Sequence, residues 1–273
     1  MINLQLIKNN ISQILALMEK NLKVRLRYKI TIFYAFISPL INIIMPLIIM
    51  NKFFEFNAEF GPWNAQNFLI YQLLAYNIIL LQGILSEFPS ELMREKYWQT
   101  LSALLIAPFN RFNLLLAIFL SRMVLISGPF IIFLVWCYIY YPVSFLTILF
   151  ALSIFLLIAL IFSGMGLLLG VFAISRESLW ISLSFLVHLV FWTSCLSFPF
   201  QIFPSFLQIF INLNPFYYIF DFLRLAWIED NVLFTISSHP LNFIILVISG
   251  ISLPFIGVYS FNKVYRKWGI VGY

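Results

Sequence analysis

Few residues of this chain have the types and spacing that catalysis needs. The histidines, His188 and His239, and the cysteines, Cys137 and Cys195, form no spaced set of metal ligands. The sequence contains no Gly-x-x-x-x-Gly-Lys-Ser/Thr loop for nucleotide phosphates, no His-Glu-x-x-His and no Gly-x-Ser-x-Gly. We therefore predict that the chain is not an enzyme and holds neither a metal nor a cofactor of its own.

Charged side chains gather instead in residues 87–111, between apolar runs long enough to cross a bilayer. Pro89 and Ser90 predict a helix start, with Ser90 as N-cap and Glu91 in the first turn, where the helix dipole favours an acid. Pro108 ends the element. The apolar residues at helical spacing on one face are Met93, Tyr97, Leu101 and Leu104. We expect a short amphipathic helix held outside the lipid.

The composition is that of an integral membrane protein. Hydrophobic residues make up 63% of the chain and charged residues 10%, whereas soluble proteins have about 45–50% and about 25%. The net charge of +6 comes from basic residues beside apolar runs, the pattern of cytoplasmic loops, so we expect no nucleic acid as a partner. The predicted fold is an all-α membrane protein with six transmembrane helices in a lipid bilayer.

The apolar runs define the six crossings, because roughly 20 residues span the hydrocarbon core. An aromatic cluster that ends at Pro142 divides the uncharged run between Arg122 and Arg176 into two. Ser163, Gly166 and Gly170 then predict close helix packing in the fourth crossing. The predicted crossings are residues 30–50, 67–86, 112–138, 143–173, 178–197 and 241–261.

Residues 1–28 are predicted to form an amphipathic helix on the cytoplasmic face. Its apolar stripe consists of Ile7, Ile11, Leu15, Met18, Leu22 and Leu26. A basic polar face suits an anionic leaflet, and packing against a partner protein is the alternative. Only Lys52 and Arg224 of the 16 basic residues then lie outside, so we expect both termini in the cytoplasm and the chain in the cytoplasmic (inner) membrane.

Residues 198–240 are rich in proline and are predicted to be short helices that dip into the outer leaflet and return. A crossing here would place the basic residues near Lys263 outside. Within the region, Asp221 and Arg224 stand at i and i+3, which predicts a structural ion pair, with a role in gating as the alternative. His239 is predicted to be solvated at the outer boundary.

Two charged residues lie near the cytoplasmic ends of crossings. Glu87 ends the second crossing, and Arg122 lies about 16 Å beyond Arg111 along a helix. The two residues either pair or flank an inner gate or portal, or they snorkel to the interface. For His188, in mid-span, a hydrogen-bonded packing role is favoured over a proton relay.

Two motifs resemble those of the type-2 ATP-binding-cassette (ABC) exporter permeases. The segment Arg94-Glu95-Lys96-Tyr97-Trp98-Gln99-Thr100-Leu101 is similar to the family's loop between the second and third spans. The segment 214–224 looks like the family's Asn-Pro…Tyr…Asp…Arg segment before the last span. With the N-terminal helix and the six spans, the resemblance covers essentially the whole chain.

The resemblance implies that the loop 87–111 contains a coupling helix that fits a groove on a separate cytoplasmic ABC ATPase, which binds ATP and Mg²⁺. It assigns this contact to Glu91, Arg94, Glu95, Tyr97, Trp98, Thr100, Leu101, Leu104, Pro108 and Arg111. It assigns the outer re-entrant motif to Asn214, Pro215, Tyr218, Asp221 and Arg224. It also implies a homodimer, with the transport pathway between the two copies.

The prediction of the substrate class rests on positions where this sequence differs from the family pattern. Gln99 and Ser102 stand where many relatives have Gly and an acid, and the Leu-Gly-x-x-Trp pattern of O-antigen, capsule and teichoic-acid permeases is missing. These differences favour export of an amphipathic, lipophilic or lipid-linked molecule over export of a polysaccharide. Rivals from other classes are an ATP-independent secondary transporter and a membrane-embedded enzyme.

Overall fold

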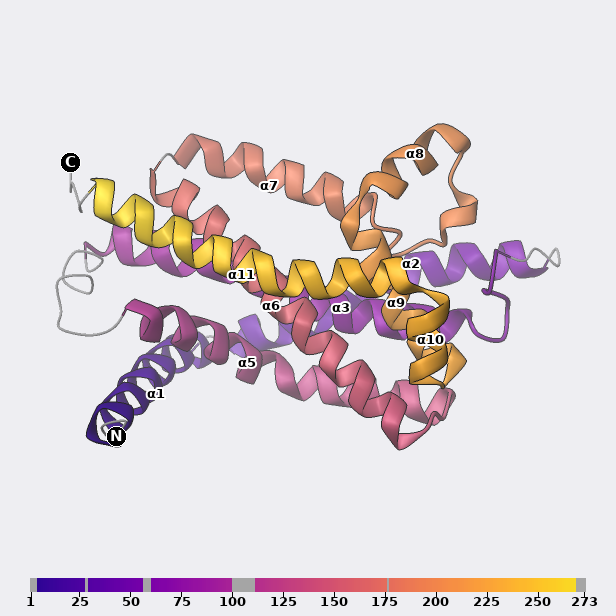
Figure 1. The fold of residues 1–273 in the computed structure, drawn as a ribbon, viewed down its shortest axis with the longest axis horizontal. Coiled ribbons are helices and arrows are strands. Elements are labelled where there is room, and N and C mark those ends of the chain that lie inside the picture. The colour runs from indigo at the N-terminus through magenta and orange to yellow at the C-terminus, as the bar shows by residue number, and fades with distance from the viewer. Residues whose placement is uncertain (1–3, 28, 56–59, 100–110, 176, 269–273) are drawn as a thin grey trace.

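The protein is a bundle of helices in the computed structural model, which describes residues 4–27, 29–55, 60–99, 111–175 and 177–268. Every regular element within these residues is helical, which confirms the predicted all-α class. The two chain ends lie at the same end of the bundle, and the short helices between α7 and α11 lie at the other (Figure 1).

Five helices of the described chain, α2, α3, α5, α6 and α11, are long and apolar enough to cross a membrane, whereas α7 is a shorter apolar helix. The sixth crossing therefore stays a prediction. The elements are α1 (Leu4–Leu26), α2 (Lys29–Glu55), α3 (Phe68–Tyr97), α5 (Arg111–Tyr140), α6 (Phe145–Ser175), α7 (Glu177–Trp192), η1 (Phe200–Ile202), α8 (Ser205–Leu213), α9 (Pro215–Glu229), α10 (Val232–Ser238) and α11 (Pro240–Trp268).

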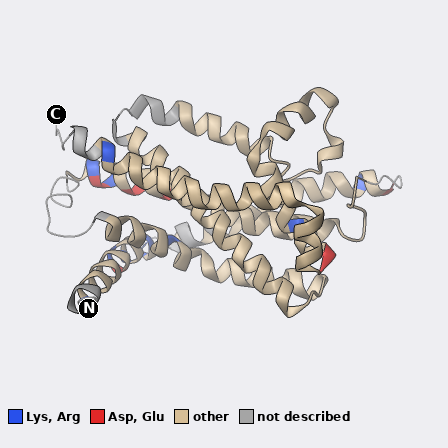
Figure 2. Cartoon of the chain, in the orientation of Figure 1, with Lys and Arg blue, Asp and Glu red and all other residues tan. Residues whose placement is uncertain are grey.

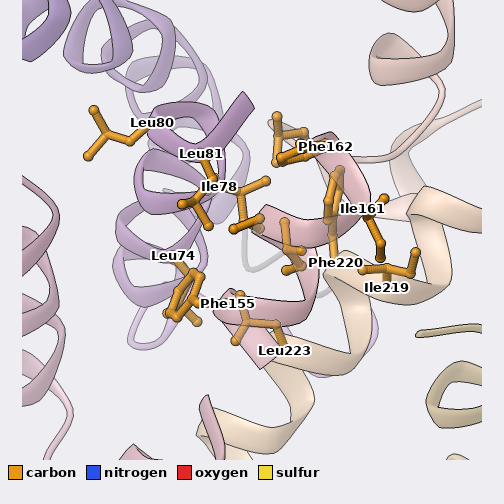
Figure 3. Packing of buried hydrophobic residues seen from close by; sticks show 14 of the residues in the cluster. Leu74, Ile78, Leu80, Leu81, Phe155, Ile161, Phe162, Ile219, Phe220 and Leu223 are labelled. Atoms are coloured by element: carbon orange, nitrogen blue, oxygen red, sulfur yellow. The ribbon is translucent and has the colours of Figure 1, made fainter. Parts of the chain in front are cut away.

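The central helix of the bundle is α3. Within its most apolar window 78% of the residues are buried, against 44% or less in the other long helices. Its apolar side chains pack against α6 and α9 (Figure 3), and the labelled side chains are Leu74, Ile78, Leu80, Leu81, Phe155, Ile161, Phe162, Ile219, Phe220 and Leu223. A movement of α3 would therefore displace side chains that pack against it from several other helices.

Small residues of α6 bring its neighbours close, as the sequence predicts. A Cβ atom added to Gly166 would lie 2.8 Å from the carbonyl oxygen of Leu85 in α3. One added to Gly164 would lie 2.4 Å from the carbonyl carbon of Leu253 in α11. Side chains at these two positions would force the helices apart, so the glycines set the spacing of α6 from both α3 and α11.

The predicted helix start at Ser90 is wrong, because α3 runs without a break from Phe68 to Tyr97. Pro89 lies inside the helix, and the Ser90 hydroxyl donates to the carbonyl of Ser86 at 2.7 Å instead of capping a new helix. Proline is tolerated within membrane helices where neighbouring helices pack around the freed carbonyl. The second apolar run and the first part of the charged loop thus form one rigid rod.

The helix α7 ends at Trp192, earlier than the predicted boundary near residue 197. The chain then turns through Cys195, which has a φ of 54°. Such a turn leaves backbone carbonyls without helical partners. Buried side chains from α3 and α9 donate to them, which explains why the helix can stop here.

Charged residues are concentrated near the chain ends (Figure 2). In the described residues the larger group lies on α1, on the last turns of α3 and near the end of α11, and a smaller group lies on the last turn of α2 and on α9. The bundle therefore has one strongly charged end and, opposite, an end with fewer charges that contains the short helices α8, α9 and α10.

Candidate functional site

The acids in the last turns of α3 face α1 rather than the surface. The side chain of Glu91 is 2% exposed and that of Glu95 is 7% exposed. Lys20 Nζ lies 2.6 Å from Glu95 Oε1, and Arg25 Nη2 donates to Glu91 Oε1 at 2.9 Å. These ion pairs fasten the N-terminal helix to the end of α3.

A third carboxylate, Glu87, lies one turn before Glu91 and faces two arginines. Arg25 Nη2 lies 2.5 Å from Glu87 Oε1, an ion pair without hydrogen-bond geometry, and Arg122 Nη1 lies 3.9 Å from Glu87 Oε2. The guanidinium of Arg122 passes over Gly83, where an added Cβ would lie only 2.0 Å from Nη2. Glu87 and Arg122 are thus drawn together inside the protein, as the pairing alternative predicts.

Two aromatic residues at the end of α3 remain exposed. Tyr97 is 67% exposed and Trp98 is 53% exposed. Arg94 connects this tip to the ionic cluster, because it contacts Glu91 and its guanidinium lies 5.2 Å from the centre of the Trp98 ring. An aromatic tip beside an arginine has the composition that protein contacts favour.

The remaining residues of the predicted coupling loop are Thr100, Leu101, Leu104 and Pro108, which lie outside the described residues. The helix α5 begins at Arg111. The assignment of these positions to an ATPase contact stays a prediction.

At the opposite end of the bundle, Asn214 and Pro215 begin α9. The side chain of Asn214 accepts a hydrogen bond from the backbone N–H of Phe216 at 3.0 Å, and Pro215 occupies the first turn, where its missing N–H costs nothing. Asn214 Nδ2 also donates to the carbonyl of Val190 at 2.6 Å. The Asn-Pro pair thus caps one helix and ties it to the end of α7.

Arg224 is the most deeply buried charge in this part of the molecule, with 1% of its surface exposed. It donates to the carbonyls of Cys195 at 3.0 Å and Leu196 at 2.6 Å, and its guanidinium lies 3.5 Å from the centre of the Tyr71 ring. The guanidinium therefore stabilises the turn that ends α7.

The predicted ion pair between Asp221 and Arg224 is wrong, because the structure gives the two residues different partners. Asp221 Oδ2 accepts a hydrogen bond from Asn242 at 3.4 Å. Burial raises the pKa of Asp221 to about 6, and the positive charge of Arg224 only partly opposes this effect. Spacing alone misled the prediction, since the carbonyls that attract Arg224 come from a segment distant in sequence.

Two further residues of this end depart from or extend the prediction. His239 is not simply solvated, because its Nε2 lies 3.0 Å from Glu229 Oε1. Tyr218, from the same motif, donates its hydroxyl to the carbonyl of Asn212 at 2.9 Å. In mid-helix, His188 Nδ1 lies 2.6 Å from the carbonyl of Ser184, a contact within its own helix.

Comparison with known proteins gives the family. The family model of ABC-2 type transporters matches residues 12–227, which include both the charged cluster and the outer motif. The chain belongs to the ABC-2 type transporter family. A search of curated proteins found no match.

As a member of the ABC-2 type transporter family, the chain is a membrane-embedded permease component and not itself the catalyst. Among the described residues, no group of three or more His, Cys, Asp or Glu is arranged to hold a metal ion. The contacts that the structure shows at the two ends of the bundle are ion pairs, hydrogen bonds and aromatic contacts.

The structure adds residues that the sequence did not assign to the site. Lys20 and Arg25 of α1 are partners of the predicted acids, and Tyr71 and Gln72 of α3 contact the turn after α7. No local spacing signals such pairs, because the partners lie far apart in the sequence. The basic polar face of the N-terminal helix was the only available signal.

Proposed function

We propose that this ABC-2 permease exports an amphipathic, lipophilic or lipid-linked molecule across the cytoplasmic membrane, driven by ATP hydrolysis on a separate cytoplasmic ABC ATPase. Two copies of the chain form the transport pathway between them, and the ATPase binds the loop that follows α3. Family membership supports the kind of partner. The observation that carries the proposal is the exposed aromatic tip, Tyr97 and Trp98, on an otherwise buried helix.

The central helix can carry a movement from one end of the bundle to the other. It has 30 residues, which corresponds to about 45 Å. Near its start, Gln72 Nε2 donates to the carbonyl of Ser197 at 2.7 Å and the Tyr71 hydroxyl donates to the carbonyl of Phe198 at 3.0 Å. A displacement of the Trp98 end would thus reach the turn before the short helices, as alternating access requires.

The N-terminal helix would move with this rod. Several of its polar residues contact the protein: Asn10 and Gln13 accept hydrogen bonds from Asn113 of α5, and Arg25 binds the acids of α3. Glu19 and Lys23, by contrast, are exposed. Its apolar residues Ile11 and Leu15 remain exposed. These exposed apolar residues support a position on the membrane surface, where they would contact lipid.

The proposed cargo follows from the character of the bundle. Aromatic residues make up 19% of the chain, and the middle of the described helices is largely free of charge. A small hydrated ion would need polar groups along its path. Apolar and aromatic surfaces suit a molecule with a large apolar part.

The test first identifies an ABC ATPase that co-purifies with the full-length chain, for example one encoded by a neighbouring gene, and then replaces Trp98 in the co-expressed pair. Trp98→Asp is expected to abolish co-purification of the ATPase and ATP-dependent export from vesicles, because a charge replaces an exposed aromatic side chain that the ATPase would bury on binding. Trp98→Phe is the matched control and should retain both. If Trp98→Asp still binds the ATPase and transports, this coupling site is refuted.

A further inference from the structure

A cavity of about 440 Å³ lies at the end of the bundle opposite the chain termini. Its walls come from the loop between α2 and α3, the segment around η1, α9, and the junction of α10 with α11. This volume is within the range of pockets for drug-sized ligands. None of the predicted roles of the outer motif accounts for a space of this size.

One carboxylate of the cavity wall lacks a strong partner. Asp221 is half-buried and accepts a single long hydrogen bond from Asn242, and no basic side chain of the described residues forms an ion pair with it. The other acid, Glu229, is already engaged, with Thr235 Oγ1 at 2.6 Å and His239 Nε2 at 3.0 Å. Asp221 is therefore the group that can accept a cation.

Aromatic side chains line the same cavity as this carboxylate. The rings of Phe200 and Tyr217 stack with centroids 5.3 Å apart, and those of Tyr217 and Tyr218 lie 5.1 Å apart. Trp63 lines the same cavity. The faces of Trp, Tyr and Phe rings attract cations, most strongly when the cation is shielded from water. The carboxylate and the rings therefore both favour binding of a cation.

Arg224, the arginine among the residues that line the cavity, does not cancel the preference of the cavity for a cation. Both terminal nitrogens of Arg224 donate to backbone carbonyls, and its guanidinium is stacked on the Tyr71 ring. Its charge is thus already matched by oxygen dipoles and a ring face. With Asp221 and Glu229 both facing the cavity, the lining carries more negative than positive charge when His239 is neutral.

We propose that this cavity binds organic cations that carry apolar substituents, with the charge on Asp221 and the substituents against Tyr217, Tyr218 and Phe200. Anions of the same shape are disfavoured. The proposal concerns binding by the permease alone, so it stands or falls separately from the proposed contact with an ATPase.

The test uses two ions of the same shape and opposite charge, tetraphenylphosphonium and tetraphenylborate. Each is titrated calorimetrically into the purified full-length chain in an uncharged maltoside detergent, with empty micelles as the blank. We expect saturable binding of tetraphenylphosphonium and, for tetraphenylborate, only the heat of the blank. Equal binding of both ions, or no saturable binding of the cation, would overturn the proposal.

Substitutions locate the site within the chain. Asp221→Asn is expected to weaken tetraphenylphosphonium binding about tenfold or more, since it removes the charge and keeps the shape. Asp230→Asn is the matched control, because Asp230 is an exposed acid that binds the backbone of Ser144 and does not line the cavity. The control should bind like the parent chain.

A second variant guards against a change in fold. Tyr217→Leu removes a ring without a charge and is expected to weaken binding about threefold or more, with an unchanged gel-filtration profile. If neither Asp221→Asn nor Tyr217→Leu alters the affinity, or if Asp230→Asn weakens it as much as Asp221→Asn, the cavity is not the site.

Discussion

The two ends of the molecule hold their helices together in different ways. At the end with the chain termini, the partners are full charges: Arg25 with Glu87 and Glu91, and Lys20 with Glu95. At the opposite end, buried side chains such as Arg224 and Gln72 donate to backbone carbonyls of one turn. Ion pairs can exchange partners as helices slide, whereas carbonyls of a fixed turn demand one geometry.

This difference matches the roles proposed for the two ends. A cluster with two acids and three arginines contains alternative pairings, so we expect α1 to shift against α3 at a small cost in free energy. The turn after α7 offers no such alternatives. A push at Trp98 is therefore expected to rearrange contacts at the charged end and to move the opposite end as a unit.

The largest loss in the free energy of unfolding is expected when the hydrogen bonds to the turn after α7 are removed. Arg224→Met would remove two charge-assisted hydrogen bonds, leaving the carbonyl of Leu196 without its donor and that of Cys195 with the Tyr71 hydroxyl alone. We expect a cost of about 3–5 kcal/mol in the free energy of unfolding. Arg224→Lys, which retains the charge but not the fork of donors, should fall between this variant and the parent chain. Unfolding of the purified chain in mixed micelles is the measurement, and a loss below about 1 kcal/mol in Arg224→Met would contradict the assigned role.

A smaller effect is expected at the charged end. Arg25→Met removes the common partner of Glu87 and Glu91, but Arg122 and Arg94 still face these acids. We expect a loss of about 1–3 kcal/mol in the same measurement. Adding Glu91→Gln to Arg25→Met should recover part of the loss, because one buried negative charge is then gone.

Failure of that recovery would show that Arg25 and Glu91 act independently. The sharper form of the comparison is a double-mutant cycle, since residues in one network show coupling and distant residues do not. Arg25→Met combined with Arg224→Met should be additive, because the two residues lie at opposite ends of the bundle.

The sequence predicts much of the fold because its signals are local. Apolar runs of bilayer length indicated the long helices, and small residues in the fourth run indicated close packing, which Gly164 and Gly166 confirm. The same local signals were misleading at Pro89 and Ser90, where packing by α6 keeps α3 continuous. A proline does not end a membrane helix where a neighbouring helix packs against the position at which a hydrogen bond is lost.

The candidate site was less predictable because its partners are distant in sequence. Pairing of Glu87 with Arg122 was foreseen only as one alternative, and the part played by Arg25 was not foreseen. Arg224 was assigned to Asp221 by its spacing, but the stronger acceptors are carbonyls that exist only because the chain turns at Cys195. Composition and periodicity carry no information on such a turn.

The smallest effect tests whether the charged end tolerates rearrangement. Gly83→Ala places a methyl group 2.0 Å from the Arg122 guanidinium, which must then move relative to Glu87. Because the obstructing atoms are the end of a flexible side chain, the expected loss is only about 1 kcal/mol. Gly128→Ala in α5 is the matched control: an added Cβ there meets nothing within 4 Å, so we expect no loss. A loss for Gly83→Ala as large as that for Arg224→Met would show that Arg122 is fixed, and the two ends would then not differ in the way argued above.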